Sequence, residues 1–204
     1  METWNKDTIA QAKKNLEGAE LKGLDLSGVD LKNANLISAN LVSANLSGAD
    51  LSGAKIFTAK GMRADLSNAN LSGASLLKAN FSRANFQGSN LNGADLMGAN
   101  LSEADLRKAD LIRAKLVEAC LTGVSLEGAD LREGTLMKMG GESGSEIVVS
   151  DLSMCSLDGA NLKSANLKSA NMNRCSAVGA ELQGAMLEGV QLQGSNLQGA
   201  NLSG

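Results

Sequence analysis

A leucine, or a residue in its place, recurs at every fifth position for most of this chain. The series runs from Leu16 to Leu136, with Gly61 and Phe81 among its exceptions, and it resumes from Leu152 to Leu202. Neither an α-helix, with 3.6 residues per turn, nor a flat strand, with a side-chain period of two, matches this period. A long regular period of five therefore requires a backbone that bends at fixed intervals.

The residues that precede each leucine are also regular. Of the 25 units between positions 16 and 136, 19 have Ala two residues before the leucine and 17 have Asn or Asp directly before it. Residues two apart in extended backbone point to the same side. Each unit, such as Ala34-Asn35-Leu36, should therefore place one small and one large apolar side chain inward, and Gly, Asn or Ser should turn the corner.

The tandem units, thirty-six in all, resemble those of the pentapeptide-repeat family over about residues 16–204. The resemblance implies an all-β fold, a right-handed quadrilateral parallel β-helix with four units per coil. About nine coils stacked at about 4.8 Å would form a solenoid roughly 43 Å long. Its core would consist of Leu and Ala ladders, which explains an aromatic content of only 2%.

Four segments follow from this pattern. Residues 1–15 are expected to form an N-terminal cap, with a short helix over 7–15, Asp7 or Thr8 as its N-cap, and Trp4 and Ile9 contacting the core. Repeats occupy 16–136 and 152–204. Between them, 137–151 form a Gly/Ser-rich loop, and the register shifts by one because Leu152 follows Leu136 by sixteen positions. The C-terminal end has no comparable cover, so either the native chain continues or the last coil meets another molecule.

Two pairs of residues test a coil length of twenty. Gly61 occupies a leucine position and Phe81 lies twenty residues later, so Phe81 fills the space left by Gly61, or else Gly61 marks a bulge with Met62 turned inward. Cys155 and Cys175 both occupy the inward small position and should stack. Their spacing allows a disulfide, but packing as reduced residues is favoured. Cys120 should point outward as a free thiol.

Composition removes many functions. The chain has no histidine, which excludes Ser-His and Cys-His nucleophile pairs and His-ligated metal sites. We predict no catalytic, cofactor-binding or metal-binding residues and no enzymatic activity. The net charge of -3 offers no broad basic surface for direct nucleic acid binding. No apolar run approaches the roughly 18 residues of a membrane span. The start of the sequence does not resemble a secretory signal, and the three cysteines are far apart in the sequence; both observations favour a cytoplasmic protein.

One outward column differs from the others. The residue after each leucine should face solvent, and one face then carries apolar residues on six successive coils, widened by two more on the adjacent face. We call this set the apolar ridge: Ile37, Phe57, Leu77, Met97, Val117 and Met137, with Val42 and Met62 beside them. A contiguous apolar strip about 24 Å long usually marks a contact surface. Alternatively, Ile147, Val148 and Val149 of the loop fold back over the ridge, or the ridge has no role.

Two functions compete. The favoured one is a non-catalytic rigid scaffold for protein–protein interaction that uses the apolar ridge, with an unidentified protein partner or a homodimer formed through the ridge or the C-terminal end. The resemblance implies an alternative, a DNA-mimicking inhibitor or protector of DNA gyrase of the quinolone-resistance type. A DNA duplex of this length carries about 25 negative charges, at one charge per roughly 1.7 Å of helix axis. The net charge of -3 argues against such mimicry.

Overall fold

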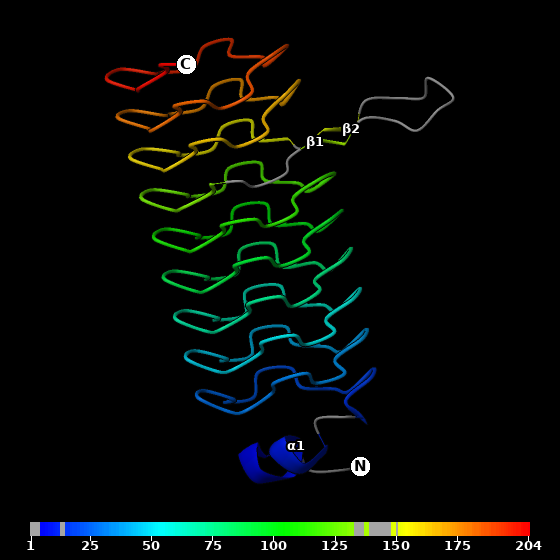
Figure 1. The fold of residues 1–204 in the computed structure, drawn as a ribbon. Helices are drawn as coiled ribbons and strands as arrows, with labels where there is room; N and C mark the ends of the chain where they lie inside the picture. Colours follow the sequence, from blue (N-terminus) through cyan, green and yellow to red (C-terminus); the bar gives the residue numbers. More distant parts are fainter. Residues whose placement is uncertain (1–4, 13–14, 133–136, 139–147, 150) are drawn as a thin grey trace.

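The structure, a computed structural model, describes residues 5–12, 15–132, 137–138, 148–149 and 151–204. These residues form a stack of coils with a single helix at the N-terminal end (Figure 1). The named elements are helix α1 (Lys6–Ala12) and strands β1 (Met137–Lys138) and β2 (Val148–Val149). No helix within these ranges has the length and apolar character that a membrane crossing needs.

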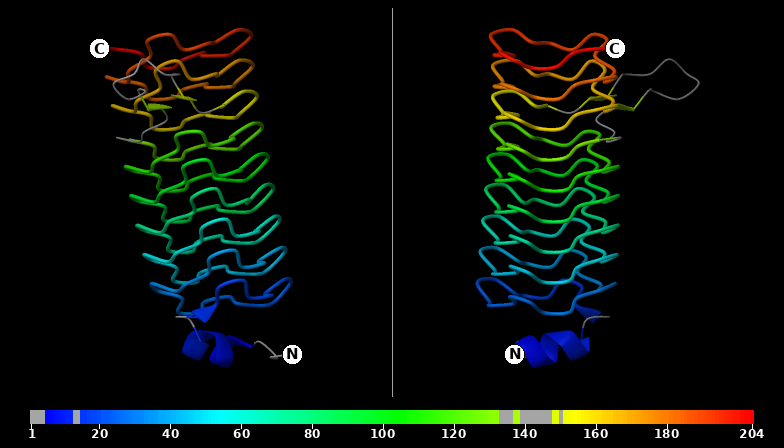
Figure 2. Two further views of the ribbon diagram at one scale, coloured as in Figure 1. Left: turned by 90° about the vertical axis from the view of Figure 1, so that its right-hand side faces the viewer. Right: turned by 60° about the vertical axis from the view of Figure 1, so that its left-hand side comes forward.

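Parallel bridges between residues twenty apart hold neighbouring coils together. The first is Glu20 with Asn40, and further bridges follow at every fifth residue, for example Asp25 with Asn45 and Asp30 with Asp50. Four bridges per turn of twenty residues give each coil four sides. The predicted coil length is therefore confirmed, and the views in Figure 2 show the coils stacked in register.

Each side ends in a tight turn that explains the residues of the repeat. The carbonyl of Leu31 accepts a hydrogen bond from the Ala34 amide at 2.9 Å, and Asn33 between them has a φ of 55°. This left-handed position favours Gly and Asn. The Asp or Asn before the leucine completes the turn, as when the Asp25 carboxylate accepts the Ser27 amide at 3.0 Å. The acidic residues of the repeat thus have a structural role as Asx-type turn residues.

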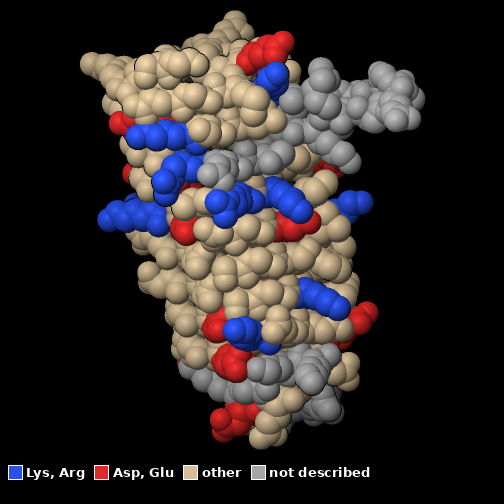
Figure 3. Space-filling model, viewed as in Figure 1, with Lys and Arg blue, Asp and Glu red and all other residues tan. Residues whose placement is uncertain are grey.

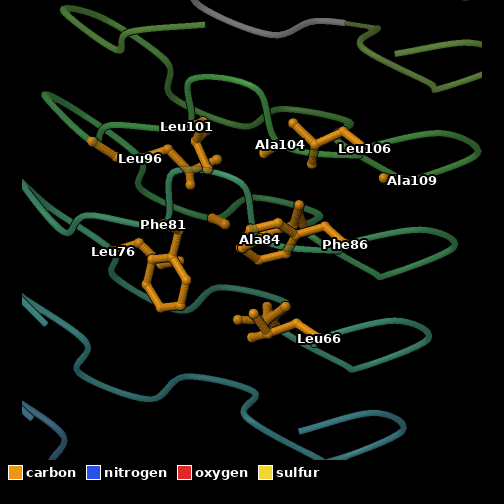
Figure 4. Close-up of a cluster of buried hydrophobic side chains, with 14 of the residues drawn as sticks. Leu66, Leu76, Phe81, Ala84, Phe86, Leu96, Leu101, Ala104, Leu106 and Ala109 are labelled. Atoms are coloured by element: carbon orange, nitrogen blue, oxygen red, sulfur yellow. The ribbon is translucent and has the colours of Figure 1, made fainter. Parts of the chain in front are cut away.

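The core is made of inward Leu and Ala ladders. Leu66, Leu76, Leu96 and Ala94 are fully buried, and the ladder residues around them lie side by side in Figure 4. The Phe81 ring points towards the preceding coil, and it packs edge-on against Phe86 with ring centroids 5.6 Å apart.

Phe81 fills the space that Gly61 leaves. A Cβ atom on Gly61 would lie 2.0 Å from Cε1 of Phe81, and Met62 is 37% exposed rather than turned inward. The compensation hypothesis is confirmed, and the alternative of an inward Met62 is wrong. The two residues are neighbours because the coil has twenty residues.

Helix α1 begins at Lys6, one residue before the predicted 7–15, and it ends earlier than predicted, at Ala12. The Asn5 side chain accepts the Thr8 amide at 2.9 Å, while Thr8 Oγ1 accepts the Asn5 amide at the same distance. This reciprocal pair makes Asn5 the N-cap, so the assignment of Asp7 or Thr8 is wrong. Ile9 is fully buried within the core, as predicted, whereas Trp4 lies outside the described residues.

The break in the repeat adds eleven residues to one coil. Across it, Cys120 pairs with Asp151 and Asp130 with Asn161, an offset of 31 instead of twenty. β1 and β2 pair antiparallel where the chain leaves and rejoins the wall, with Met137 opposite Val149. The stack therefore continues through residues 151–204 in the shifted register.

Candidate interaction surface

The apolar ridge is a continuous column because backbone hydrogen bonds join its successive residues to the coils below. The Phe57 carbonyl accepts the Ser38 amide at 2.8 Å, the Leu77 carbonyl accepts the Thr58 amide at 3.0 Å, and the Met97 carbonyl accepts the Lys78 amide at 2.9 Å. Successive ridge side chains are therefore about 4.8 Å apart. The spacing lets each side chain pack against the next.

Most of the ridge is accessible. Ile37, Phe57, Leu77 and Met97 are half-buried, in contrast with the fully buried leucine that precedes each of them. On the adjacent face Val42 is half-buried and Met62 is exposed. The prediction that residues after the leucine face outward is correct for these six positions.

Val117 is a correction to the predicted ridge. Its side chain is only 3% exposed. Val117 precedes Met137, the first residue of β1, by twenty positions, so it is the last ridge position before the regular wall is interrupted. Val117 offers no accessible surface to a partner.

The loop end of the ridge is described only for its backbone. Met137 is the first residue of β1, and Val148 and Val149 form β2; Ile147 lies outside the described residues. In Figures 1 and 2, β1 and β2 extend away from the stack rather than down over the coils that carry Phe57 and Leu77. These two strands therefore leave the lower part of the ridge uncovered.

Positively charged side chains flank the lower part of the ridge. Lys55 and Lys78 lie close to Phe57 and Leu77 in the sequence. The exposed cations of this region form no side-chain ion pair with any described residue; they are Lys55, Lys60, Arg63 and Lys78. The bridge partners of Lys55 are Asn35 and Ser75, and those of Lys60 are Asn40 and Asn80. No carboxylate thus compensates these two lysines from the coils directly above and below.

A paired arginine marks the upper limit of this cationic region. Arg83 donates two hydrogen bonds to Glu103, twenty residues later, at 2.9 and 3.0 Å. The hydrogen bonds, assisted by charge attraction, lower the pKa of Glu103 and raise the pKa of Arg83. This pair was not predicted from the sequence, although two opposite charges twenty residues apart at the same repeat position were a signal for it.

A second apolar area lies at the C-terminal end of the stack. Met186, Leu192 and Leu202 are 44%, 37% and 49% exposed, although Leu192 and Leu202 occupy leucine positions of the repeat. The equivalent leucines next to α1, Leu16 and Leu21, are fully buried. The inward leucines are therefore more exposed in these coils than beside α1.

Charges elsewhere on the surface are mixed. The face shown in Figure 3 carries Lys and Arg side chains beside Asp and Glu rather than a continuous acidic surface. Among the described residues, no three Cys, Asp or Glu side chains gather in a way that would hold a metal ion.

The four-sided stack of twenty-residue coils defines a β-helical solenoid. A family model described as pentapeptide repeats matches eight copies over residues 15–53, 64–102, 94–132, 150–176 and 165–204. The chain belongs to the pentapeptide-repeat family, whose fold is a right-handed β-helix.

Solved structures agree with this family. HetL, a pentapeptide repeat protein involved in heterocyst differentiation regulation from the cyanobacterium Nostoc sp. strain PCC 7120, is 28% identical, with a TM-score of 0.51 over 95% of this chain and 93% of HetL. A trypsin-treated form of QnrB1, a plasmid-mediated fluoroquinolone resistance protein, is 20% identical, with a TM-score of 0.72 over 88% of this chain and 84% of QnrB1. The second likeness concerns the fold alone. No curated protein matches the sequence.

Proposed function

We propose that this protein is a non-catalytic rigid scaffold whose apolar ridge binds a protein partner. The observation that carries the proposal is the run of accessible apolar side chains Ile37, Phe57, Leu77 and Met97 on successive coils. The same repeat positions on another face hold Lys32, Ser52, Ser72 and Asn92. Because the core is supplied entirely by the inward ladders, the fold does not need these outward apolar residues.

The backbone makes the ridge a preorganised surface. Inter-coil hydrogen bonds hold each ridge residue in register, so little conformational entropy is lost from the scaffold on binding. A phenylalanine, a leucine and two methionines, Met62 and Met97, offer an anchor and adaptable contacts. This combination suits a partner segment that lies along the stack axis.

The flanking charges point to the chemistry of that partner. Lys55 and Lys78 lie close to Phe57 and Leu77 in the sequence, and Lys60 and Arg63 lie close to Met62. None of these four cations forms an ion pair with a described carboxylate. An apolar segment flanked by Asp or Glu would bury its apolar side chains on the ridge and place its carboxylates near these cations. We therefore infer an acidic, amphipathic protein segment as the partner.

The relationship to HetL is compatible with a regulatory role, since that relative is involved in the regulation of a differentiation process. We propose that this chain also has a regulatory role, exerted through the protein contact at its own ridge. We also place the scaffold in the cytoplasm as part of the proposal, a compartment in which free cysteines such as those of this chain are the usual resting state.

A peptide selection tests the proposal. Peptides are selected from a random display library on the wild-type protein, and their affinities are then measured by fluorescence anisotropy for wild type, for the Phe57→Ser/Leu77→Ser variant and for a Ser52→Asn/Ser72→Asn control. The control changes the same repeat position on nearby coils of another face. We expect selected peptides to be apolar and acidic, and the ridge variant to weaken binding at least tenfold while the control binds as wild type.

Other outcomes would contradict the proposal. Equal binding to wild type and the ridge variant would remove the ridge as the contact surface. Self-association that is lost in the ridge variant, measured by sedimentation, would identify a second copy of this chain as the occupant. Inhibition of gyrase supercoiling at low protein concentration, unchanged in the ridge variant, would favour the gyrase-directed alternative.

A further inference from the structure

Two buried cysteines face each other across adjacent coils near the C-terminal end. Cys155 and Cys175 occupy the inward small position twenty residues apart, and each is only 2% exposed. The Ser176 amide donates to the Cys155 carbonyl at 3.0 Å, so the two coils are joined at this point. Both thiols are free, and their sulfur atoms are 3.0 Å apart.

This arrangement needs little movement to become a disulfide. A disulfide has an S–S length of about 2.05 Å and joins Cα atoms about 4.4 to 6.8 Å apart. Adjacent coils are separated by about 4.8 Å, so the backbone already lies within this range. An approach of about 1 Å between the sulfurs, by side-chain rotation, is sufficient.

We propose that Cys155 and Cys175 form a reversible oxidation site, at which a hydroperoxide converts the two thiols into an intramolecular disulfide. The site is independent of the apolar ridge and of its partner. It lies in the core, and the wild-type sequence supplies both sulfurs at a position where most other units have Ala.

The hydrogen bonds order the two thiols. Cys175 Sγ lies 2.6 Å from the Leu152 carbonyl, to which it donates its proton, so the hydrogen bond between the sulfurs is donated by Cys155. This bond, together with burial, raises the pKa of Cys155, and it lowers the pKa of Cys175. Cys175 is therefore the sulfur that loses its proton first.

The chemistry balances with one equivalent of peroxide. The Cys175 thiolate attacks one peroxide oxygen, the O–O bond breaks, and Cys175 becomes a sulfenic acid while the departing hydroxide takes the thiol proton as water. The Cys155 sulfur then attacks the Cys175 sulfur, the S–O bond breaks, and hydroxide leaves as water with the Cys155 proton. Two thiols and one hydrogen peroxide thus give one disulfide and two waters.

The site lies near the less protected end of the stack. Leu192 and Leu202, in the coils that follow Cys175, are 37% and 49% exposed, whereas Ile9 is fully buried at the opposite end. Local opening costs least where few core contacts must be broken. Opening of these last coils gives peroxide a route to the thiols, and the disulfide then closes a loop of one coil and ties its neighbours together.

Mass spectrometry of the full-length chain tests this proposal. In a Cys120→Ser background, which removes the half-buried third thiol, the protein is treated with hydrogen peroxide, denatured and alkylated with N-ethylmaleimide. We expect both alkylation sites to disappear, the intact mass to fall by two hydrogen atoms before alkylation, and dithiothreitol to restore both sites. The thermal midpoint should rise on oxidation.

Matched variants distinguish the pair from general oxidation. Cys155→Ala and Cys175→Ala each restore the residue that most units carry, and each should show no peroxide-dependent rise in the thermal midpoint. Two thiols that remain alkylatable after peroxide treatment would overturn the proposal. A disulfide found only between two molecules, or an oxidised monomer with a lower thermal midpoint, would overturn it as well.

Discussion

The contact between Gly61 and Phe81 lets the coil geometry be tested by a double-mutant cycle. A Cβ atom on Gly61 would lie 2.0 Å from Cε1 and 2.2 Å from Cδ1 of Phe81. Gly61 does not have a left-handed φ, so its backbone accepts a side chain. The three atoms nearest to such a Cβ all belong to the Phe81 ring, so this ring blocks a leucine at position 61, where the repeat normally has one.

The three variants should differ sharply in stability. Phe81→Leu removes three side-chain carbons from the core and, at about 0.8 kcal/mol each, should cost about 2 to 3 kcal/mol of unfolding free energy. Gly61→Leu forces overlap with the ring and should cost about 3 kcal/mol or more. The double variant places leucine above leucine, as in the other ladders, and should lie within about 1 kcal/mol of wild type.

Urea unfolding followed by circular dichroism measures these differences. For a chain of this size, about 1 kcal/mol corresponds to roughly 2 to 4 °C in the thermal midpoint, so thermal unfolding provides an independent check. If the losses of the two single variants simply add in the double variant, the two side chains do not share one space. That result would refute both the compensation and the stacking of residues twenty apart.

Three further predictions concern particular polar side chains. Ser89 is 1% exposed, and its hydroxyl has no hydrogen-bond partner. Ser89→Ala should therefore stabilise the fold by about 1 to 2 kcal/mol, measured as a higher midpoint of urea unfolding. The control Ser75→Ala, at an outward position of the wall, should have little effect. The hydrogen bond from Arg107 lowers the pKa of Asp105. The contribution of this bond to the free energy of unfolding is therefore present above the ordinary Asp pKa and is lost as the pH falls through the lowered value. Asp105→Asn should reduce the loss of stability in urea between pH 7 and pH 3, and an unchanged pH profile would count against this role. Asn5→Ala should destabilise the N-terminal end of α1 by about 1 kcal/mol. Amide hydrogen exchange should become faster at Thr8 and Ile9 and stay unchanged in the coils. Uniformly faster exchange throughout the chain would contradict local capping.

The repeat determines most of the fold from the sequence. A five-residue period with two inward positions predicts the ladders, and Gly61 with Phe81 identifies the coil length because a missing side chain needs a filled neighbour. The same periodicity placed Cys155 and Cys175 on adjacent coils. It could not predict their 3.0 Å separation, since that depends on side-chain rotamers rather than on register.

The candidate site was predictable where it follows the regular wall and not where the wall is interrupted. The sequence identifies Ile37, Phe57, Leu77 and Met97 as outward-facing because each follows a leucine. Val117 follows the same rule but is buried, since exposure depends also on what lies above, and that coil adjoins the irregular segment. The cap at Asn5 was missed for a similar reason, because it depends on a reciprocal bond with Thr8 and on no part of the repeat.

The interruption itself shows why the solenoid tolerates an irregular length. Its eleven extra residues are not a multiple of five, yet Asp130 pairs with Asn161 as regularly as Asp110 pairs with Asp130. Each wall residue is held by bonds to the coils directly above and below, so the register is set by the ladder rather than by the chain that connects it. The antiparallel pairing of Met137 with Val149 brings the two ends of the excursion together, and the chain re-enters the wall where the ladder requires it. Insertion at this position therefore leaves the ridge below and the cysteine pair above within one continuous stack.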